Sequence, residues 1–128
     1  MANPSITNAT AVGKEVLRRS YINETSTETE QDILTGVANH IMTILSIIIH
    51  DRSAQADNYF NMYIDYDLGG SDLYLLGNQE VGAYGTFIWN DRFVLTETDK
   101  LHMIGVSATG TANYKVWCTY IDQQFAAP

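Results

Sequence analysis

The fold is decided by the stretch Thr86-Phe-Ile-Trp-Asn-Asp-Arg-Phe-Val-Leu-Thr-Glu-Thr-Asp-Lys-Leu-His-Met-Ile-Gly-Val-Ser107. Its apolar runs flank a polar Thr-Glu-Thr-Asp-Lys corner, and another apolar run follows the segment Ala-Thr-Gly-Thr-Ala-Asn. Short runs of β-branched and aromatic residues between polar turn residues are typical of strands. This part of the chain therefore predicts strands at 86–89, 92–96, 101–106 and 114–121. Residues 89–92 fit either a tight turn or a bulge within one long strand.

The upstream sequence adds three or four strands. Residues 41–50 are apolar at both parities, which predicts a strand either central in a sandwich or covered by a partner. Residues 58–66 alternate as a half-buried strand does, and 73–76 form a short strand. Residues 16–22 fit a strand or a short helix, and we favour a strand. The segments 23–31, 51–57 and 77–85 are predicted loops or turns, the last with three glycines.

Seven or eight short strands without helical periodicity predict an all-β protein, an antiparallel β-sandwich of jelly-roll or Ig-like type. Residues 1–13 are small, polar and aperiodic, and predict an extended N-terminal arm. We expect residues 1–35 to hold this arm and the first strand, and residues 36–128 to form the sandwich domain.

The charge balance excludes several functions. The chain has 128 residues, of which 17% are charged, and a net charge of −8. About 25% is usual, so the surface must be rich in uncharged polar groups, as is common in proteins buried in assemblies. Phosphate binding needs Lys and Arg, so we expect no nucleic-acid partner. The basic cluster Lys14, Arg18 and Arg19 fits docking on an acidic neighbouring subunit or a solvated surface.

The residues with chemical reactivity form no recognisable catalytic motif. Cys118 stands alone in an apolar strand and is predicted to be a buried thiol. His40, His50 and His102 lack metal-site spacing, and His102 is predicted on the outer face of its strand. The chain has neither a G-x-S-x-G elbow nor a phosphate-binding loop. We therefore expect no enzyme activity and no cofactor, with an unmarked carboxylate pair as the remaining enzymatic alternative.

One acidic turn suggests a calcium site. Asp65, Asp67 and Asp72 surround a pair of glycines, and carboxylate oxygens suit Ca²⁺. An EF-hand loop is excluded because Gly69 and Leu76 occupy positions that need oxygen ligands. A different calcium turn stays open, but aspartates that simply end a strand are the preferred interpretation.

No segment predicts membrane insertion or secretion. The N-terminus lacks a signal-peptide pattern, and the apolar run 41–49 is too short to span a bilayer. We expect a soluble protein. Aromatic residues predict an interaction surface, since exposed Tyr and Trp are enriched at interfaces; core packing and a sugar-stacking platform are the alternatives. The candidate interface residues are Lys14, Arg18, Arg19, Tyr59, Tyr63, Trp89, Trp117 and Tyr120.

Residues 36–122 resemble a known family. The resemblance is carried by the Ile-rich run 41–50, the aromatic strand 59–66, the segment Phe93-Val-Leu-Thr-Glu-Thr-Asp-Lys-Leu101, and the closing Tyr-Lys-Val-Trp-Cys-Thr-Tyr-Ile. Together they resemble small β-sandwich virion structural proteins of tailed bacteriophages. In that family a Val-Leu-x-x-x-Asp-x-Leu corner links two strands, and a strand ending in Ser-Tyr or Thr-Tyr closes the domain.

The resemblance implies a non-enzymatic capsid decoration or cement subunit. It also implies a homotrimer that contacts the major capsid protein or other virion proteins, located in the virion after assembly in the host cytoplasm. A neck, tail or fibre component and a carbohydrate-binding host-attachment module are the alternatives. No catalytic residues come with this family.

Overall fold

The computed structural model describes residues 15–23, 28–107, 110 and 112–125, and every regular element in these ranges is a β-strand. No helix among the described residues is long and apolar enough to cross a membrane. The strands are β1 (Glu15–Ile22), β2 (Gln31–Thr35), β3 (His40–Asp51), β4 (Tyr59–Tyr66), β5 (Ser71–Glu80), β6 (Thr86–Trp89), β7 (Phe93–Thr96), β8 (Lys100–Val106) and β9 (Tyr114–Gln124).

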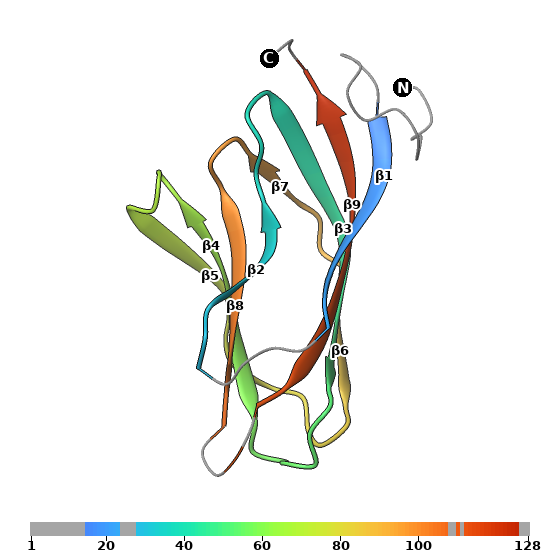
Figure 1. Cartoon of the computed structure of the whole chain (residues 1–128), viewed down its shortest axis with the longest axis vertical. Coiled ribbons are helices and arrows are strands. Elements are labelled where there is room, and N and C mark those ends of the chain that lie inside the picture. The colour runs from blue at the N-terminus through green and yellow to red at the C-terminus, as the bar shows by residue number, and fades with distance from the viewer. Residues whose placement is uncertain (1–14, 24–27, 108–109, 111, 126–128) are drawn as a thin grey trace.

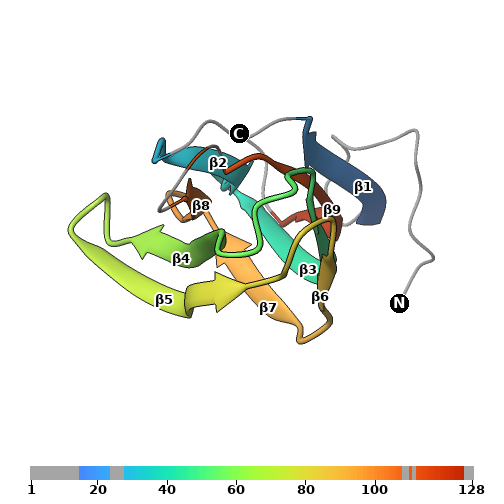
Figure 2. The same cartoon turned by 90° about the horizontal axis from the view of Figure 1, so that it is seen from below.

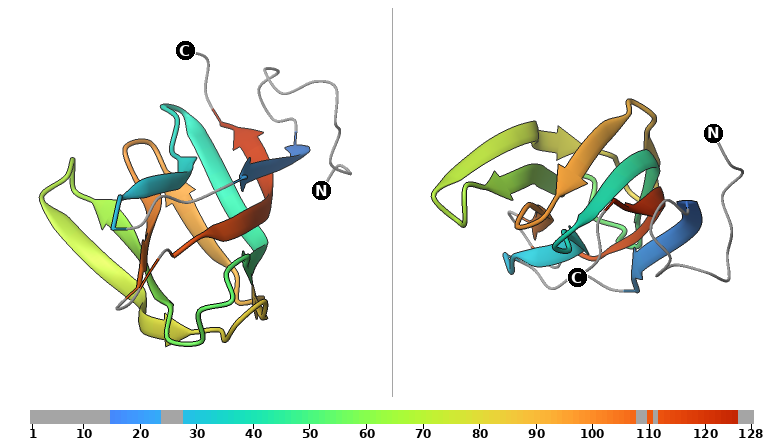
Figure 3. Two further views of the ribbon diagram at one scale, coloured as in Figure 1. Left: turned by 60° about the horizontal axis from the view of Figure 1, so that its bottom comes forward. Right: turned by 90° about the horizontal axis from the view of Figure 1, so that it is seen from above.

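The strands form two antiparallel sheets that pack face to face (Figures 1, 2 and 3). Sheet A has the order β1-β9-β3-β6, and β7 also pairs with β3. Sheet B has the order β2-β8-β4-β5. The predicted antiparallel β-sandwich is thus confirmed.

The strand order identifies the sandwich as a jelly roll. β6 pairs with residues 47–50 of β3 and β7 with residues 41–44, so the two short strands share one position beside β3. Eight strand positions result, and they pair as nested hairpins: β1 with β9, β2 with β8, β3 with β6 and β7, and β4 with β5. This is the wrapping of a jelly roll, whereas an immunoglobulin domain has a different order. Residues 90–92 separate β6 from β7, which would otherwise form one continuous strand beside β3.

A bulge in β3 explains why its sequence is apolar at both parities. The register with β9 shifts between Ile44 and Ser46, and a bulge of one residue reverses which side chains face inward. Met42 and Ile44 face the core before the bulge, and Ile47 and Ile49 face it afterwards. β3 lies in the interior of sheet A, between β9 and β6. A central position was one of the two alternatives predicted for this strand.

Two predicted loops are wrong in part. The predicted loop 23–31 is wrong at its last residue, because Gln31 begins β2, which pairs with β8. No element was predicted for residues 32–35, which include polar side chains and show little alternation. The predicted loop 77–85 is wrong at its start, because β5 continues from Leu76 through Gly77 to Glu80. This part of the edge strand is bulged but still pairs with β4. The preferred strand at residues 16–22 is confirmed as β1.

The first two strands belong to the two sheets: β1 pairs with β9 and β2 with β8. The division of the chain at residue 35 stays a prediction. The proposed arm and Lys14 lie outside the described residues.

The core lies between the sheets and is built from inward side chains of both. Gly105 of β8 is required there, because a Cβ at this position would come within 2.9 Å of the Tyr114 ring. The fully buried large side chains include Ile44, Ile47, Ile49, Phe60, Met62, Leu95, Leu101, Met103 and Tyr114.

Candidate functional site: the outer faces of the two sheets

Sheet A presents a row of apolar side chains on the side away from the core. The register places Tyr21 of β1 opposite Trp117 of β9, Trp117 opposite Ile48 of β3, and Ile48 opposite Ile88 of β6. Their exposed fractions are 54%, 42%, 38% and 55%, in the order Tyr21, Trp117, Ile48, Ile88. We call these four residues the aromatic row; it crosses the whole sheet.

A second apolar row lies parallel to the first. It consists of Leu17, Ile121, Thr43 and Val94, again in direct register across β1, β9, β3 and β7. Leu17 and Val94 are about half exposed. Between the rows lies Arg19, opposite Thr119. We call the two rows and the polar residues between them the sheet A outer face.

The aromatic row is organised around a cation. The rings of Tyr21 and Trp117 are stacked with centroids 6.0 Å apart. The Arg19 Cζ lies 4.8 Å from the Trp117 ring centroid and 5.5 Å from that of Tyr21, which is within cation–π range. A depression of about 370 Å³ beside these rings is lined in part by Arg19 and Lys115. The face is therefore apolar with a positively charged centre and rim.

The exposed apolar area of this face is comparable to the largest apolar patch of a typical monomer, about 300–600 Å². About half of each of six large side chains is exposed here, which amounts to on the order of 500 Å² of surface when aromatic side chains have about 150–250 Å² each. The largest apolar patch of a monomer is often functional, and here it consists of two rows separated by Arg19 and Thr119.

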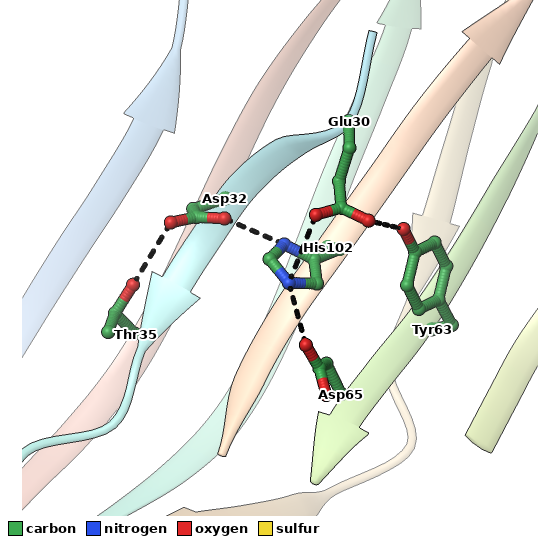
Figure 4. A network of polar contacts seen from close by, with 6 residues as sticks. All are labelled: Glu30, Asp32, Thr35, Tyr63, Asp65 and His102. Atoms are coloured by element: carbon green, nitrogen blue, oxygen red, sulfur yellow. Dashed lines mark hydrogen bonds and ion pairs between the residues drawn. The ribbon is translucent and has the colours of Figure 1, made fainter. Parts of the chain in front are cut away.

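The outer face of sheet B is organised around a buried histidine (Figure 4). His102 of β8 has only 4% of its side chain exposed. Its Nδ1 lies 2.7 Å from Asp32 Oδ1, although the two are not aligned for a hydrogen bond. Its Nε2 lies 3.6 Å from both Glu30 Oε1 and Asp65 Oδ2. Three carboxylates therefore converge on one imidazole.

Tyr63 of β4 completes this network. Its hydroxyl donates a hydrogen bond to Glu30, and its ring packs against His102 with centroids 5.4 Å apart. Tyr74 of β5 stacks on the other side at 4.9 Å. Burial, followed by the Glu30 interaction, raises the pKa of the Tyr63 hydroxyl.

The contacts of this network link neighbouring strands, and its imidazole is not accessible to a ligand. Asp32 is on β2, His102 on β8 and Asp65 on β4, so the contacts join edge strand β2 to β8 and β8 to β4. The nearby depression of about 360 Å³ is lined by Asp65 and Lys100 but not by His102. His102 does lie on the outer face, as predicted, but neighbouring side chains bury it there.

The acidic turn shows no convergent ligand set. Asp65 contacts His102, and Asp72 lies opposite Asp65 with its side chain exposed. Asp67 is in the hairpin turn, where its carbonyl accepts a hydrogen bond from the Gly70 amide. Among the described residues no group of three or more His, Cys, Asp or Glu side chains is arranged to hold a metal ion.

The predicted interface residues are dispersed over the molecule. Arg19 and Trp117 lie on the sheet A outer face. Arg18 points to the inner side, where its Nε is 3.1 Å from Asp122 Oδ2, and His40 contacts the same carboxylate at 2.6 Å. Arg18 therefore ties β1 to β9 and, through His40, to the start of β3.

The remaining aromatic candidates contribute to packing. Tyr120 is 8% exposed and belongs to the core, and Tyr63 is 3% exposed within the histidine network. Trp89 packs edge-on against Phe93, and its indole nitrogen donates to the Asp91 carbonyl at 2.7 Å. Tyr59 is half-buried on the outer side of sheet B.

Several residues of the sheet A outer face were not predicted individually: Leu17, Tyr21, Ile48, Ile88 and Val94. Each is an ordinary strand residue in sequence, and only the register shows that they align. The sequence signals for this surface are the residue types of Arg19 and Trp117, which were predicted as interface residues.

Cys118 confirms the prediction of a buried thiol. It lies on the inner side of β9, between Trp117 and Thr119. Burial raises the pKa of the Cys118 thiol to about 12, against a smaller opposing effect of a hydrogen bond with Ser20. The thiolate needed for nucleophilic chemistry is therefore disfavoured.

Comparison with known proteins finds structures of similar fold but no matching protein family. No protein-family model matches the chain, and no curated protein matches it. Solved structures do. The VP2 protein of infectious bursal disease virus in derived T=1 particles superposes with a TM-score of 0.55 at 8% identity, over 90% of this chain and 33% of that one.

Two further structures of the same virus agree. The Gx strain gives a TM-score of 0.52 at 12% identity, over 84% of this chain and 33% of the viral chain. The T13 viral particle gives 0.51 at 8% identity, over 91% and 37%. The chain thus spans about a third of the length of these viral chains and shares a β-sandwich fold with that part of them.

Proposed function

We propose that this chain is a non-enzymatic structural subunit of a virus particle, which acts by burying the sheet A outer face against neighbouring subunits. The observation that carries the proposal is that face: two apolar rows in register across one sheet of a jelly roll. Burial of such a surface is favourable by about 25 cal/mol per Å². The viral origin of the similar folds supports a particle as the setting.

Within a particle, the finer role we propose is that of a capsid decoration or cement subunit of a tailed bacteriophage, acting as a homotrimer on the major capsid protein. The corner and closing-strand resemblance supports this choice. Many copies that each bind modestly would stabilise a shell through multivalency.

Mass spectrometry of purified particles from the source of this sequence tests the proposal. The chain should be found in them, at hundreds of copies if it decorates the capsid and in small multiples of three or six if it belongs to a neck, tail or fibre. Absence of the chain from the particles contradicts a structural role.

A glycan-binding function has one observation in its favour, the exposed stacked pair Tyr21 and Trp117 beside a depression. Against it, Arg19 lies over both rings and occupies the surface on which a sugar would stack. Titration with cell-surface polysaccharide should leave the tryptophan fluorescence unchanged. A saturable change that Trp117→Ala abolishes would favour the glycan function instead.

A further inference from the structure

The sheet A outer face is locally positive in an acidic protein. Arg19 and Lys115 are both exposed there, with Lys115 opposite His50. Glu15, at the far end of β1, is buried. Since the whole chain has a net charge of −8, this face is complementary to much of the rest of the surface.

The outer face of sheet B has the opposite character. Glu30 and Asp32 have 52% and 51% of their side chains exposed, and Asp72 and Glu80 are exposed further along the sheet. Lys100 offsets only part of this charge. Tyr74, 55% exposed, provides an apolar centre among the carboxylates.

We infer that the sheet A outer face of one copy of this chain docks on the outer face of sheet B of a second copy. The contact would bring Arg19 and Lys115 against the carboxylates and the aromatic row against Tyr74. This inference rests on the proposed function, because it names the partner surface of the same structural subunit. The contact is heterologous, so its repetition closes a ring or extends a filament.

The symmetric alternatives are disfavoured by charge. Contact between two sheet A faces would oppose Arg19 and Lys115 to the same cations, and contact between two sheet B faces would oppose carboxylates. Like charges across an interface cost free energy and select against that pairing.

The area available suits this kind of association. On the order of 500 Å² of exposed side chain approaches the roughly 800 Å² that each partner contributes to a standard interface. Polar residues between the rows add to it. Self-association should therefore depend on concentration and weaken with salt, which screens the exposed charges.

Charge reversal of each face, followed by sedimentation velocity of the full chain over a wide concentration range, tests the inference. The face A variant carries Arg19→Glu and Lys115→Glu. The face B variant carries Asp72→Lys and Glu80→Lys, which avoid the His102 contacts. Each should weaken self-association by about tenfold or more, and a chain with all four substitutions should recover it.

The matched control is Asp91→Lys with Glu97→Lys, which changes the net charge as the face B variant does but lies in connecting segments. It should associate like the wild type. A face B variant that associates normally overturns the inference, as does a wild-type chain that stays monomeric at every concentration. A monomeric chain that is nevertheless found in particles would contradict this contact and leave the proposed function standing.

Discussion

The outer faces of the two sheets differ in what their side chains contact. On sheet B, His102, Tyr63 and three carboxylates contact one another within the chain and the imidazole is almost fully buried, although His102 Nδ1 and Asp65 Oδ1 have no hydrogen-bond partner among the described residues. On sheet A, large apolar side chains in two rows remain about half exposed. The contacts on sheet B hold its own edge strand β2. The outer face of sheet A instead exposes apolar side chains, and burying them against another molecule would be favourable.

The largest effect on stability should come from the centre of sheet B. His102→Ala removes a buried ring and leaves three carboxylates facing one another, which should lower the free energy of unfolding by about 3 kcal/mol. Urea denaturation measures this. The control is Ile48→Ala on β3 of sheet A, which is 38% exposed and should cost only about 1 kcal/mol in the monomer. Equal costs would contradict the proposed difference between the faces.

The pH dependence of unfolding should show that the inner side of sheet A, unlike its outer face, is closed to solvent. The probe is the buried thiol of Cys118. The pKa of Cys118 is raised from 9.0 to about 12 in the folded protein, so the folded state holds the proton longer. The stability from this thiol is therefore complete below pH 9 and falls as pH rises toward 12, by up to about 1.4 kcal/mol per pH unit.

Comparison of unfolding free energies from neutral to alkaline pH in wild type and Cys118→Ala measures this slope. The variant should lose stability less steeply, since Cys118 contributes nothing to the raised pKa of Tyr114 and is the last and smallest cause of the raised pKa of Tyr120. In the native protein a thiol reagent should label Cys118 slowly. Rapid labelling at neutral pH would show that solvent reaches the inner side of β9.

A smaller effect is expected for the hydroxyl in the sheet B network. Tyr63→Phe removes the donor to Glu30 and should cost about 1 kcal/mol. Tyr74→Phe, in the stacked and exposed neighbour, should cost almost nothing. Thermal or urea unfolding compares the pair, and an equal response would mean that the Glu30 hydrogen bond adds nothing to stability.

The smallest effect should come from the edge of the aromatic row. Ile88→Thr should change the unfolding free energy by no more than about 0.5 kcal/mol, while it lowers binding of a hydrophobic dye to the native protein. Ile49→Thr, on the inner side of neighbouring β3, should be strongly destabilising because Ile49 is fully buried. Similar costs for the two would show that sheet A is buried on both sides.

The sequence predicts most strands because turn residues separate short apolar runs, as the residues 86–106 illustrate. It could not predict which face of β3 is buried, because the bulge near Leu45 reverses the parity within one strand. It also missed β2, because residues 32–35 show no strand alternation; Asp32 of this strand contacts His102.

The candidate surface was harder to predict than the fold. Trp117 and Arg19 were identified from residue type, but Tyr120 has the same type and lies in the core. The distinction is set by parity and register, which place Tyr21, Trp117, Ile48 and Ile88 in one line. These are properties of pairing between strands distant in sequence.

The pairing of the first strand with the last has a consequence for the architecture of larger proteins. Glu15 at the start of β1 lies opposite Gln123 near the end of β9, and Figure 1 shows β1 beginning beside the arrowhead of β9. A unit whose ends lie side by side can be inserted into a loop of a host protein without separating that loop's ends. By the same geometry, a short linker between residues 124 and 15 would permit circular permutation, with new termini opened at the exposed turn between β4 and β5.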